Sequence, residues 1–281
     1  MSDGSVDLHC HTTASDGTFT PGELVEEARR RGLAAIAVTD HDSVSGIDEA
    51  TAKGAEIDVE VVPGLELSTD VDNGEVHILG YFIDPEDRGL LGLLESQRES
   101  RLERVRKMLD RLSDLGVQLS MDEVRRASDG GALGRPHVAQ ALIRAGHVSS
   151  WDEAFSRYIG RHAPAYVRRS KLSPHDAVRA ILAAGGVPVL AHPGLSGHDD
   201  MIHSLVEAGL AGIEAIYPDH SEEQRTRYAG LARQYGLIVT AGSDCHGPKS
   251  SSGTRIGLAT TDYGVVRQLR EKALIERGLT M

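Results

Sequence analysis

The chain has few of the residues that mark secreted or membrane-spanning proteins. Its 281 residues include only two cysteines, and 4% of its residues are aromatic. Two cysteines cannot build a disulfide framework, which favours a reducing compartment and predicts a cytoplasmic location. No apolar run reaches the roughly 18 residues of a membrane-spanning helix. Residues 1–5 also lack the basic and apolar regions of a signal peptide, so we expect no membrane partner.

Positive charge is scarce as well. Asp and Glu number 42 against 30 Lys and Arg, which gives a formal net charge of −12. An acidic chain binds long polyanions poorly, so we expect no long nucleic acid as a partner. What the chain has in excess is histidine, with 13 residues. Histidine beside an excess of carboxylates is the composition that a metal site would give.

Strands and helices are predicted to alternate over residues 4–85 and 172–275. One helix is expected after Thr20, which can cap it, with Pro21 in its first turn, and another from Asp42. The alternation favours an α/β fold with parallel strands, either a barrel or a doubly wound sheet. The predicted strands are 6–11, 34–39, 59–62, 76–81, 187–191, 212–216 and 237–241.

The middle of the chain has a different pattern, with no convincing strand. We interpret it as a helical insertion between two halves of the α/β body. The predicted domains are therefore 1–87 with 172–281, and an inserted domain over 88–171. The predicted helices of the insertion are 90–115, 121–127, 136–145 and 151–158.

Histidine and carboxylate residues recur at or near the carboxyl ends of the predicted strands. His9 and His11 alternate on the first strand, so their side chains share a face. In α/β folds the carboxyl ends of parallel strands meet where active sites form. Scattered polar residues would not repeat this placement, so the pattern predicts a metal site. It recurs at Ser15-Asp16-Gly17, Thr39-Asp40-His41-Asp42, Glu66, His77, Ala191-His192-Pro193-Gly194 and Gly242-Ser243-Asp244-Cys245-His246.

This ordered set of motifs resembles the polymerase and histidinol phosphatase (PHP) family of metal phosphoesterases. The resemblance implies a distorted seven-stranded (β/α) barrel with a small helical insertion domain. It also implies two to three divalent metal ions at the barrel mouth, and no ligand position departs from the family pattern. The implied metal ligands are His9, His11, Asp16, His41, Glu66, His77, His192, Asp244 and His246.

The ligand set also indicates which metals to expect. Nine ligands are too many for one ion, since a single Zn²⁺ takes about four. Imidazoles and carboxylates without thiolates suit Mn²⁺ first, then Fe²⁺ or Zn²⁺, and Glu66 can bridge two ions. Cys10 and Cys245 stand between ligands, but strand alternation turns them outward, where we expect them buried and inert. Asp40 and Asp42 are expected to orient ligands through hydrogen bonds, or to cap the next helix.

Clustered divalent ions fit the hydrolysis of a phosphate ester, in which a metal-bound hydroxide attacks phosphorus. His198, and less strongly His220, are candidates to protonate the leaving group, the alternative being solvated loop histidines. An insertion that caps the mouth could aim cations at substrate phosphates, although the arginines on its first helix could equally form a solvated face. The predicted substrate-binding residues are Arg101, Arg104, Arg135, Arg168 and Lys171.

Within the family, the compact form with this insertion is similar to bacterial stand-alone phosphatases of nucleotides, including 3′,5′-bisphosphates, and to 5′→3′ exonucleases on short RNA. The implied function is hydrolysis of phosphate monoesters of AMP or 3′,5′-bisphosphonucleotides, or action on the 5′ ends of short RNA. Few aromatic residues and the acidic balance favour a small or short substrate. Two alternatives stay open: a histidinol-phosphate phosphatase, and a non-catalytic metal-binding module.

Overall fold

The computed structural model describes residues 4–71, 74–127, 133–167, 172–248 and 255–279. The chain divides into two compact units. One unit consists of Met1–Gly92 with Lys171–Met281, and the other of Leu93–Ser170. Among the described residues, no helix is long and apolar enough to cross a membrane. The cytoplasmic location stays a prediction.

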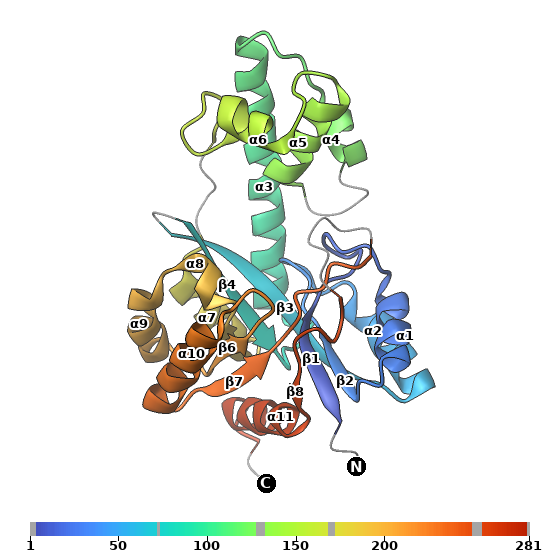
Figure 1. Cartoon of the computed structure of the whole chain (residues 1–281), viewed down its shortest axis with the longest axis vertical. Helices are drawn as coiled ribbons and strands as arrows, with labels where there is room; N and C mark the ends of the chain where they lie inside the picture. The colour runs from blue at the N-terminus through green and yellow to red at the C-terminus, as the bar shows by residue number, and fades with distance from the viewer. Residues whose placement is uncertain (1–3, 72–73, 128–132, 168–171, 249–254, 280–281) are drawn as a thin grey trace. The chain divides into compact units, whose positions relative to one another are not determined.

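The first unit is built around a mixed sheet that curls into a nearly closed barrel (Figure 1). The strand order is β7-β6-β5-β4-β3-β2-β1-β8. A bridge between Cys10 at the end of β1 and Cys245 beyond β7 brings the two sides of the sheet together. The distorted barrel is confirmed, with a two-residue strand, β8, that the sequence analysis did not predict. The strands are β1 (Ser5–Cys10), β2 (Ala35–Val38), β3 (Glu60–Val71), β4 (Gly74–Tyr81), β5 (Val187–Leu190), β6 (Gly212–Ile216), β7 (Ile238–Ala241) and β8 (Thr261–Asp262).

The expectation of parallel strands throughout is wrong for β4, which runs antiparallel to both β3 and β5. Only two residues separate β3 from β4, too few for the crossover that parallel neighbours require. The short β8 is also antiparallel to its neighbour, β1. The reversal of β4 has a consequence for the site, because the first half of β4 lies beside the second half of β3.

Helices cover the outside of the barrel and one end of it. The helix α1 begins as predicted, with Thr20 and Glu23 in a capping box and Pro21 in the first turn. The next helix, α2, begins at Ile47 and not at Asp42, whose φ of 48° lies outside the helical region. The helices of this unit are α1 (Pro21–Arg30), α2 (Ile47–Ile57), α7 (Pro174–Ala183), α8 (Pro193–Ser196), the 3₁₀ turn η2 (Asp199–Met201), α9 (Ile202–Glu207), α10 (Glu222–Tyr235) and α11 (Gly264–Glu276).

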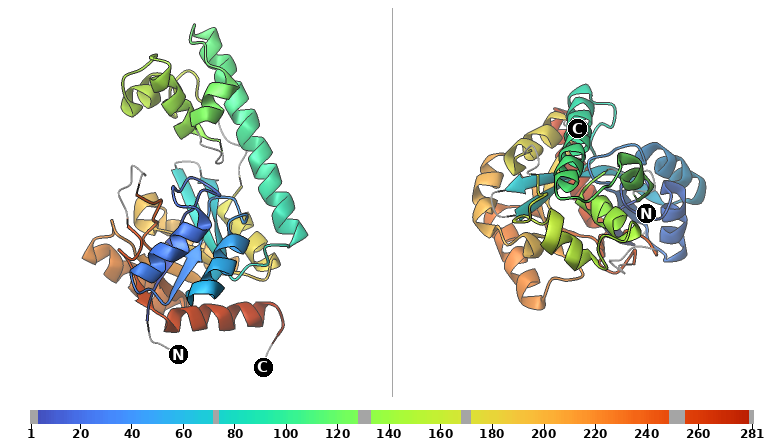
Figure 2. Two further views of the ribbon diagram at one scale, coloured as in Figure 1. Left: turned by 90° about the vertical axis from the view of Figure 1, so that its right-hand side faces the viewer. Right: turned by 90° about the horizontal axis from the view of Figure 1, so that it is seen from above.

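Two apolar clusters hold this unit together. The barrel interior contains apolar side chains from β1 to β5 together with residues of α11, which lies across the lower end of the barrel in Figure 1 and in the left view of Figure 2. A second cluster fills the layer between β1, β2 and the helix α1, and it contains Cys10 and Cys245. Both cysteines are buried, so the expectation of buried thiols in the strand–helix layer is confirmed.

The second unit is helical and has a hydrophobic core of its own. Its shorter helices pack on the carboxyl-terminal half of α3, through Val105, Met108 and Leu112 (Figure 2). The helix predicted over 151–158 is one α-helical turn followed by a π-helical turn. The elements are α3 (Arg88–Asp114), which begins in the first unit, α4 (Met121–Ala127), α5 (Arg135–Arg144), α6 (Trp151–Ala154) and the π-helix η1 (Phe155–Ile159).

Candidate metal centre

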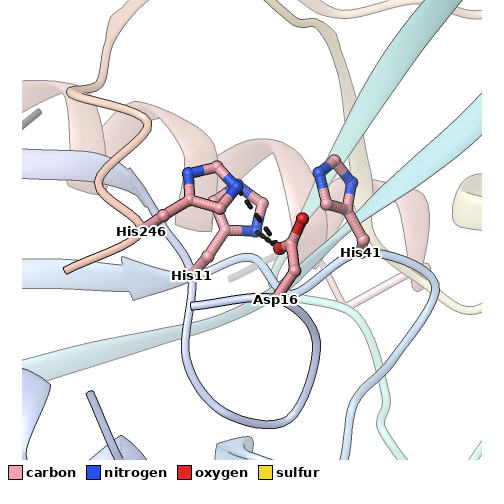
Figure 3. A group of neighbouring side chains, drawn as sticks. All are labelled: His11, Asp16, His41 and His246. Atoms are coloured by element: carbon pink, nitrogen blue, oxygen red, sulfur yellow. Dashed lines mark ion pairs between the residues drawn. The ribbon is translucent and has the colours of Figure 1, made fainter. Parts of the chain in front are cut away.

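Histidine and carboxylate side chains meet at one end of the barrel in three groups. Among the described residues, the ligand atoms within each group lie within 4.8 Å of one another. Figure 3 shows the first group, whose side chains come together from the loops after β1, β2 and β7. The groups are His11, Asp16, His41 and His246; His9, His11, Glu66 and Asp244; and His41, Glu66 and His77. Eight of the nine predicted ligands therefore belong to a group.

The three groups overlap, and each pair of groups shares one residue. His11 belongs to the first and second groups, Glu66 to the second and third, and His41 to the first and third. Shared ligands hold ions at the short separations, about 3.5–4 Å, that multinuclear hydrolase sites use. The geometry suits two to three neighbouring ions better than separate sites.

Glu66 is the centre of this arrangement and is fully buried. Its two carboxylate oxygens face different sets of imidazoles, so it can bridge two ions. The ninth predicted ligand, His192, joins the cluster through this carboxylate. The Oε2 contacts are His9 Nε2 at 3.3 Å, His11 Nε2 at 3.3 Å and His41 Nδ1 at 3.0 Å, and the Oε1 contacts are His77 Nδ1 at 2.9 Å and His192 Nε2 at 3.1 Å.

The strands bring these side chains together in a way that differs from the prediction in one respect. The sequence analysis placed Glu66 after the end of a short strand, but it lies inside β3, which continues to Val71. His77 reaches the same region because β4 is reversed, so that His77 pairs with Ser68 of β3. Two ligand positions, His192 and Asp244, have positive φ angles of 26° and 53°. Such backbone strain costs about 1–3 kcal/mol and is typical of functional sites.

The cluster contains buried polar atoms that hydrogen bonds do not satisfy. His9 Nε2, both ring nitrogens of His11 and Glu66 Oε2 are buried without a hydrogen-bond partner. Leaving such atoms unsatisfied is costly, by about 1–3 kcal/mol each, and a divalent cation would satisfy several of them at once. Imidazole nitrogens and carboxylate oxygens without thiolates fit Mn²⁺, Fe²⁺ or Zn²⁺. The residues present therefore fit the metals that the sequence predicts.

The charges of the cluster are strongly coupled. Burial lowers the pKa of His11, but Asp244 and Glu66 raise it to about 10, and Glu66 likewise raises the pKa of His77 to about 10 against the effect of burial. Burial lowers the pKa of His41 to about 4. Burial alone would raise the pKa of Glu66 and Asp244, but the surrounding histidines hold both pKa values well below their usual range. The carboxylates are therefore ionised at neutral pH, as metal ligands must be.

Asp40 and Asp42 both hold loops in place. The buried carboxylate of Asp40 accepts bonds from the Thr12 N–H at 2.7 Å, the Thr12 hydroxyl at 2.7 Å and the Ser15 hydroxyl at 2.6 Å. These bonds fix the loop after β1, which carries a predicted ligand. Asp42 Oδ1 accepts the N–H of Ser68 at 3.1 Å and ties its loop to β3. The geometry supports the orienting role, whereas the alternative of capping α2 is wrong.

Two residues that contact predicted ligands were missed by the sequence analysis. Glu214 is fully buried in β6, where its Oε1 lies 3.0 Å from His9 Nδ1. Tyr217 follows β6, and its hydroxyl donates to Asp244 Oδ2 at 3.0 Å. A carboxylate in the middle of the apolar strand 212–216 was a usable signal, because strands seldom bury an unpaired acid. Nothing in the sequence distinguished Tyr217.

The two candidate proton donors occupy different environments. His220 is buried, its Nδ1 lies 3.0 Å from Ala215 O, and its Nε2 accepts the Gly194 N–H at 3.1 Å. These bonds engage both ring nitrogens and indicate a structural role, so His220 is neither a solvated loop residue nor a good proton donor. His198 is partly exposed and lies beside Gly74 at the start of β4. Its role as an acid stays a prediction.

Two of the predicted substrate-binding arginines contact aromatic rings in the helical unit. The Arg135 guanidinium lies 5.8 Å from the ring centre of Phe155 and 5.9 Å from that of Tyr166. Arg104 lies 5.8 Å from the same Tyr166 ring, and its Nε donates to Val167 O at 2.8 Å. Arg104 therefore holds the segment before the return to the barrel, a structural task that the sequence analysis did not foresee.

Of the other three predicted substrate-binding residues, the structure describes only Arg101. Arg101 lies beside Gly134, the residue before Arg135, so these two arginines occupy the same region of the helical unit. Arg168 and Lys171 lie outside the described residues. The structure thus brings Arg101, Arg104 and Arg135 to one part of this unit.

An α/β barrel with overlapping groups of imidazole and carboxylate ligands at one end defines a metal-dependent hydrolase. Comparison with known families makes the assignment specific: the PHP domain matches residues 7–169, and the chain belongs to this family. Three of the predicted ligands, His192, Asp244 and His246, lie beyond the matched residues, but the structure brings them to the cluster. The protein is a metal-dependent phosphoesterase, as the resemblance of its motifs implied.

Relatives and solved structures agree with this class. The chain is 37% identical over 253 residues to a 3′,5′-nucleoside bisphosphate phosphatase of Chromobacterium violaceum, covering 87% of this chain and 88% of that protein. It is 34% identical over 247 residues to a 5′-3′ exoribonuclease of Haemophilus influenzae, covering 86% and 90%. It is 52% identical over 271 residues to an error-prone DNA polymerase of Mycobacterium tuberculosis, covering 95% of this chain but 21% of the polymerase. A crystal structure from Bifidobacterium adolescentis, described as a metal-dependent phosphoesterase, matches 96% of both chains with 33% identity and a TM-score of 0.82.

Proposed function

We propose that this protein hydrolyses phosphate monoesters of nucleotides, either AMP or 3′,5′-bisphosphonucleotides, or acts on the 5′ ends of short RNA. The observation that carries the proposal is the set of three overlapping ligand groups around the buried Glu66 carboxylate. When bound there, two to three divalent ions, Mn²⁺ first and Fe²⁺ or Zn²⁺ next, would polarise the phosphate and lower the pKa of the attacking water. The names of the phosphatase and exoribonuclease relatives support nucleotides as the substrate class.

The chain's own residues have two further tasks in this proposal. Glu66, Asp16 and Asp244 are ionised and, with their histidine neighbours, hold the ions in place. The leaving oxygen needs a proton, and His198 is the candidate donor because its ring is partly exposed. Its substitution should lower turnover and leave metal binding intact.

The distribution of charge supports the helical unit as the part that binds the anionic substrate. Residues 93–170 contain 14 Lys and Arg against 10 Asp and Glu, whereas the rest of the chain contains 16 against 32. Cations that contact phosphate groups form charge-assisted hydrogen bonds. We therefore retain the proposal that the insertion acts as a substrate cap, with Arg101 and Arg135 as its phosphate-binding residues.

Arg135→Ala tests the binding role of the insertion. Loss of a charge-assisted contact, worth about 1.5–3 kcal/mol, should raise the KM for a bisphosphonucleotide about 10- to 100-fold and leave kcat unchanged. Steady-state kinetics on the metal-replete protein measure both constants. Arg144→Ala, at the other end of α5, is the matched control, since Arg144 donates to the backbone oxygen of Arg126. An unchanged KM in Arg135→Ala would remove this residue from the phosphate pocket.

A substrate panel tests the function as a whole. Protein whose Mn, Fe and Zn content has been measured by elemental analysis is assayed with adenosine 3′,5′-bisphosphate, AMP, a 5′-phosphorylated RNA of a few nucleotides, and histidinol phosphate. We expect turnover of the nucleotides, the RNA, or both. Exclusive turnover of histidinol phosphate would favour the alternative phosphatase and overturn the proposal.

The polymerase relative gives a specific reason to retain a second candidate. Because the chain matches about a fifth of an error-prone DNA polymerase, a non-catalytic metal-binding module that serves a polymerase is also conceivable. The complete ligand cluster argues for catalysis. Metal-loaded protein that is inert towards every phosphate ester of the panel would establish the second candidate instead.

A further inference from the structure

Among the strands β1 to β7, β6 is distinctive because none of the nine predicted ligands lies on it or in the loop that follows. Its residues nevertheless contact three of those ligands. Glu214, in the middle of β6, contacts His9 and His192, and Tyr217, directly after β6, contacts Asp244. We propose that Glu214 and Tyr217 are positioning residues, which hold these three ligands in the orientation that binds metal. The inference rests on the proposed metal centre.

The hydrogen bond from His9 to Glu214 determines which imidazole nitrogen is available to a metal. His9 Nδ1 lies 3.0 Å from Glu214 Oε1, and both side chains are fully buried. The carboxylate accepts a hydrogen bond at Nδ1, so in the neutral ring that binds metal the proton resides on Nδ1 and Nε2 keeps its lone pair. Nε2 is the atom that faces Glu66 Oε2 at 3.3 Å and Asp244 Oδ1 at 3.5 Å, inside the second ligand group.

Both oxygens of Glu214 are used. His9 Nδ1 lies 3.0 Å from Oε1 and 3.2 Å from Oε2, and Oε2 also accepts the backbone N–H of His192 at 2.9 Å. The His192 backbone has a φ of 26°, a strained value that this bond helps to hold. An amide at position 214 would place an NH₂ group in one of these two oxygen positions, where it would face the N–H of His9 or of His192 in place of an acceptor.

The backbone of Gly242 approaches the His9–Glu214 pair closely. A Cβ atom on Gly242, just beyond β7, would lie 2.2 Å from His9 Cβ and 2.6 Å from Glu214 Oε1. Only glycine therefore allows the end of β7 to approach this pair. The close approach fixes both partners of the His9–Glu214 bond and supports a role in orientation.

Tyr217 acts on the other side of the same ligand group. Its hydroxyl donates to Asp244 Oδ2 at 3.0 Å, which directs the other oxygen, Oδ1, to within 3.0 Å of His11 Nε2. The Tyr217 ring is itself held, with its centre 5.4 Å from that of His192 and 5.2 Å from that of His220. β6 therefore orients ligands that come from β1, β5 and β7.

The test measures metal binding, without substrate, in Glu214→Gln and Tyr217→Phe. Loss of an outer-shell partner typically weakens metal affinity about 10- to 100-fold, and we expect a change of this size from competition with a chelator and from metal content after dialysis. The chain offers a matched control pair. Tyr263 donates to Glu60, a carboxylate that lies at the start of β3, six residues before Glu66. Glu60→Gln and Tyr263→Phe should therefore leave metal affinity unchanged.

Circular dichroism of each variant confirms that it is folded. A folded Glu214→Gln that binds metal within about twofold of the wild-type affinity would overturn the proposal. If Glu214→Gln does not fold, Tyr217→Phe decides, since it removes a single oxygen atom, and wild-type affinity in that variant overturns the proposal. A wild-type protein that binds metal but hydrolyses neither the nucleotides nor the RNA would overturn the proposed function and leave this inference intact.

Discussion

Single residues at the barrel end belong to more than one candidate ligand group. His11, Glu66 and His41 each belong to two of the three groups. We therefore expect loss of a shared residue to alter two metal positions at once, and loss of Asp16 or His77 to alter one. The loss of bound metal on substitution should therefore be larger for a residue that belongs to two groups than for a residue that belongs to one.

His11→Ala should abolish turnover and lower the metal content by at least one ion per chain. The fold should persist, because the barrel is held together by apolar clusters that do not include His11. Elemental analysis, thermal unfolding and the phosphatase assay measure the three effects. His203→Ala, an exposed histidine paired with Glu207 on α9, is the control and should behave as wild type. Near-wild-type turnover in metal-replete His11→Ala would refute the site assignment.

Metal binding should release protons. In the metal-free protein the pKa values of His11 and His77 are raised to about 10, so both rings carry a proton at neutral pH that a metal ion must displace. Apparent metal affinity should therefore rise with pH between about 6 and 9. Calorimetric titrations in two buffers of different ionisation enthalpy count the protons released. Equal enthalpies in the two buffers would contradict the prediction.

The same two groups fix the sign of the pH dependence of stability in the metal-free protein. Their folded pKa values of about 10 lie above the ordinary value of 6.5. Their contribution to the free energy of unfolding is therefore fully present below pH 6.5, and it is lost as the pH rises through about 10. Denaturant titrations with a chelator present would show this as a falling midpoint over that range.

At the scale of elements, the short strand β1 carries both core residues and a predicted metal ligand. The pairing of β1 with β2 shifts between Asp7 and Cys10, so the side chains do not alternate evenly. Leu8 belongs to the barrel interior, Cys10 to the layer beneath the helices, and His9 to the metal cluster. The irregularity lets one short strand serve three environments.

The positions of Cys10 and Cys245 predict thiols that do not react in the native state. Burial raises the pKa of both, which leaves little thiolate to attack a reagent. Ellman's reagent should detect no thiol in folded protein and two per chain in denaturant. Rapid labelling of the native protein would show that the barrel side is open between β1 and the segment after β7.

The reversed strand β4 shows where element prediction fell short. The sequence Asp72-Asn73-Gly74 contains the Asn-Gly pair typical of tight hairpins, and it lies between two predicted strands. Weighing that turn would have predicted the antiparallel pair of β3 and β4, and with it the reason that His77 reaches the site. The long β3 was harder to predict, because its polar middle at Glu66 looked like a loop.

At the scale of the whole molecule, negative charge is concentrated outside the helical unit. The barrel unit carries the acidic surplus, while the helical unit is basic. Divalent ions in the cluster would reverse the charge locally at the barrel end, so an acidic protein can still bind an anionic substrate there. The remaining acidity is the reason that we expect a preference for small substrates over long nucleic acids.

Removal of metal should lower the stability of the protein. Ions that bind only the folded state stabilise it by about 4 kcal/mol each when the free ion concentration is a thousand times Kd. Relief of the buried, unsatisfied atoms of His9, His11 and Glu66 is the physical origin of this gain. Thermal unfolding with EDTA should show a lower Tm than with Mn²⁺, and re-addition of metal should restore it. An unchanged Tm would mean that the cluster does not hold ions tightly.

The sequence by itself determined which residues meet at the site. The predicted ligands follow or occupy predicted strands, a pattern that indicated a metal site, and the resemblance of the motifs to the PHP family named all nine. Only the tertiary structure decided how they are shared among three groups, that Glu66 lies at their centre, and that Glu214 contacts two of them. The reason is that these relations depend on strand register, the reversal of β4 and the closure of the barrel. All three are set by packing between residues far apart in the chain.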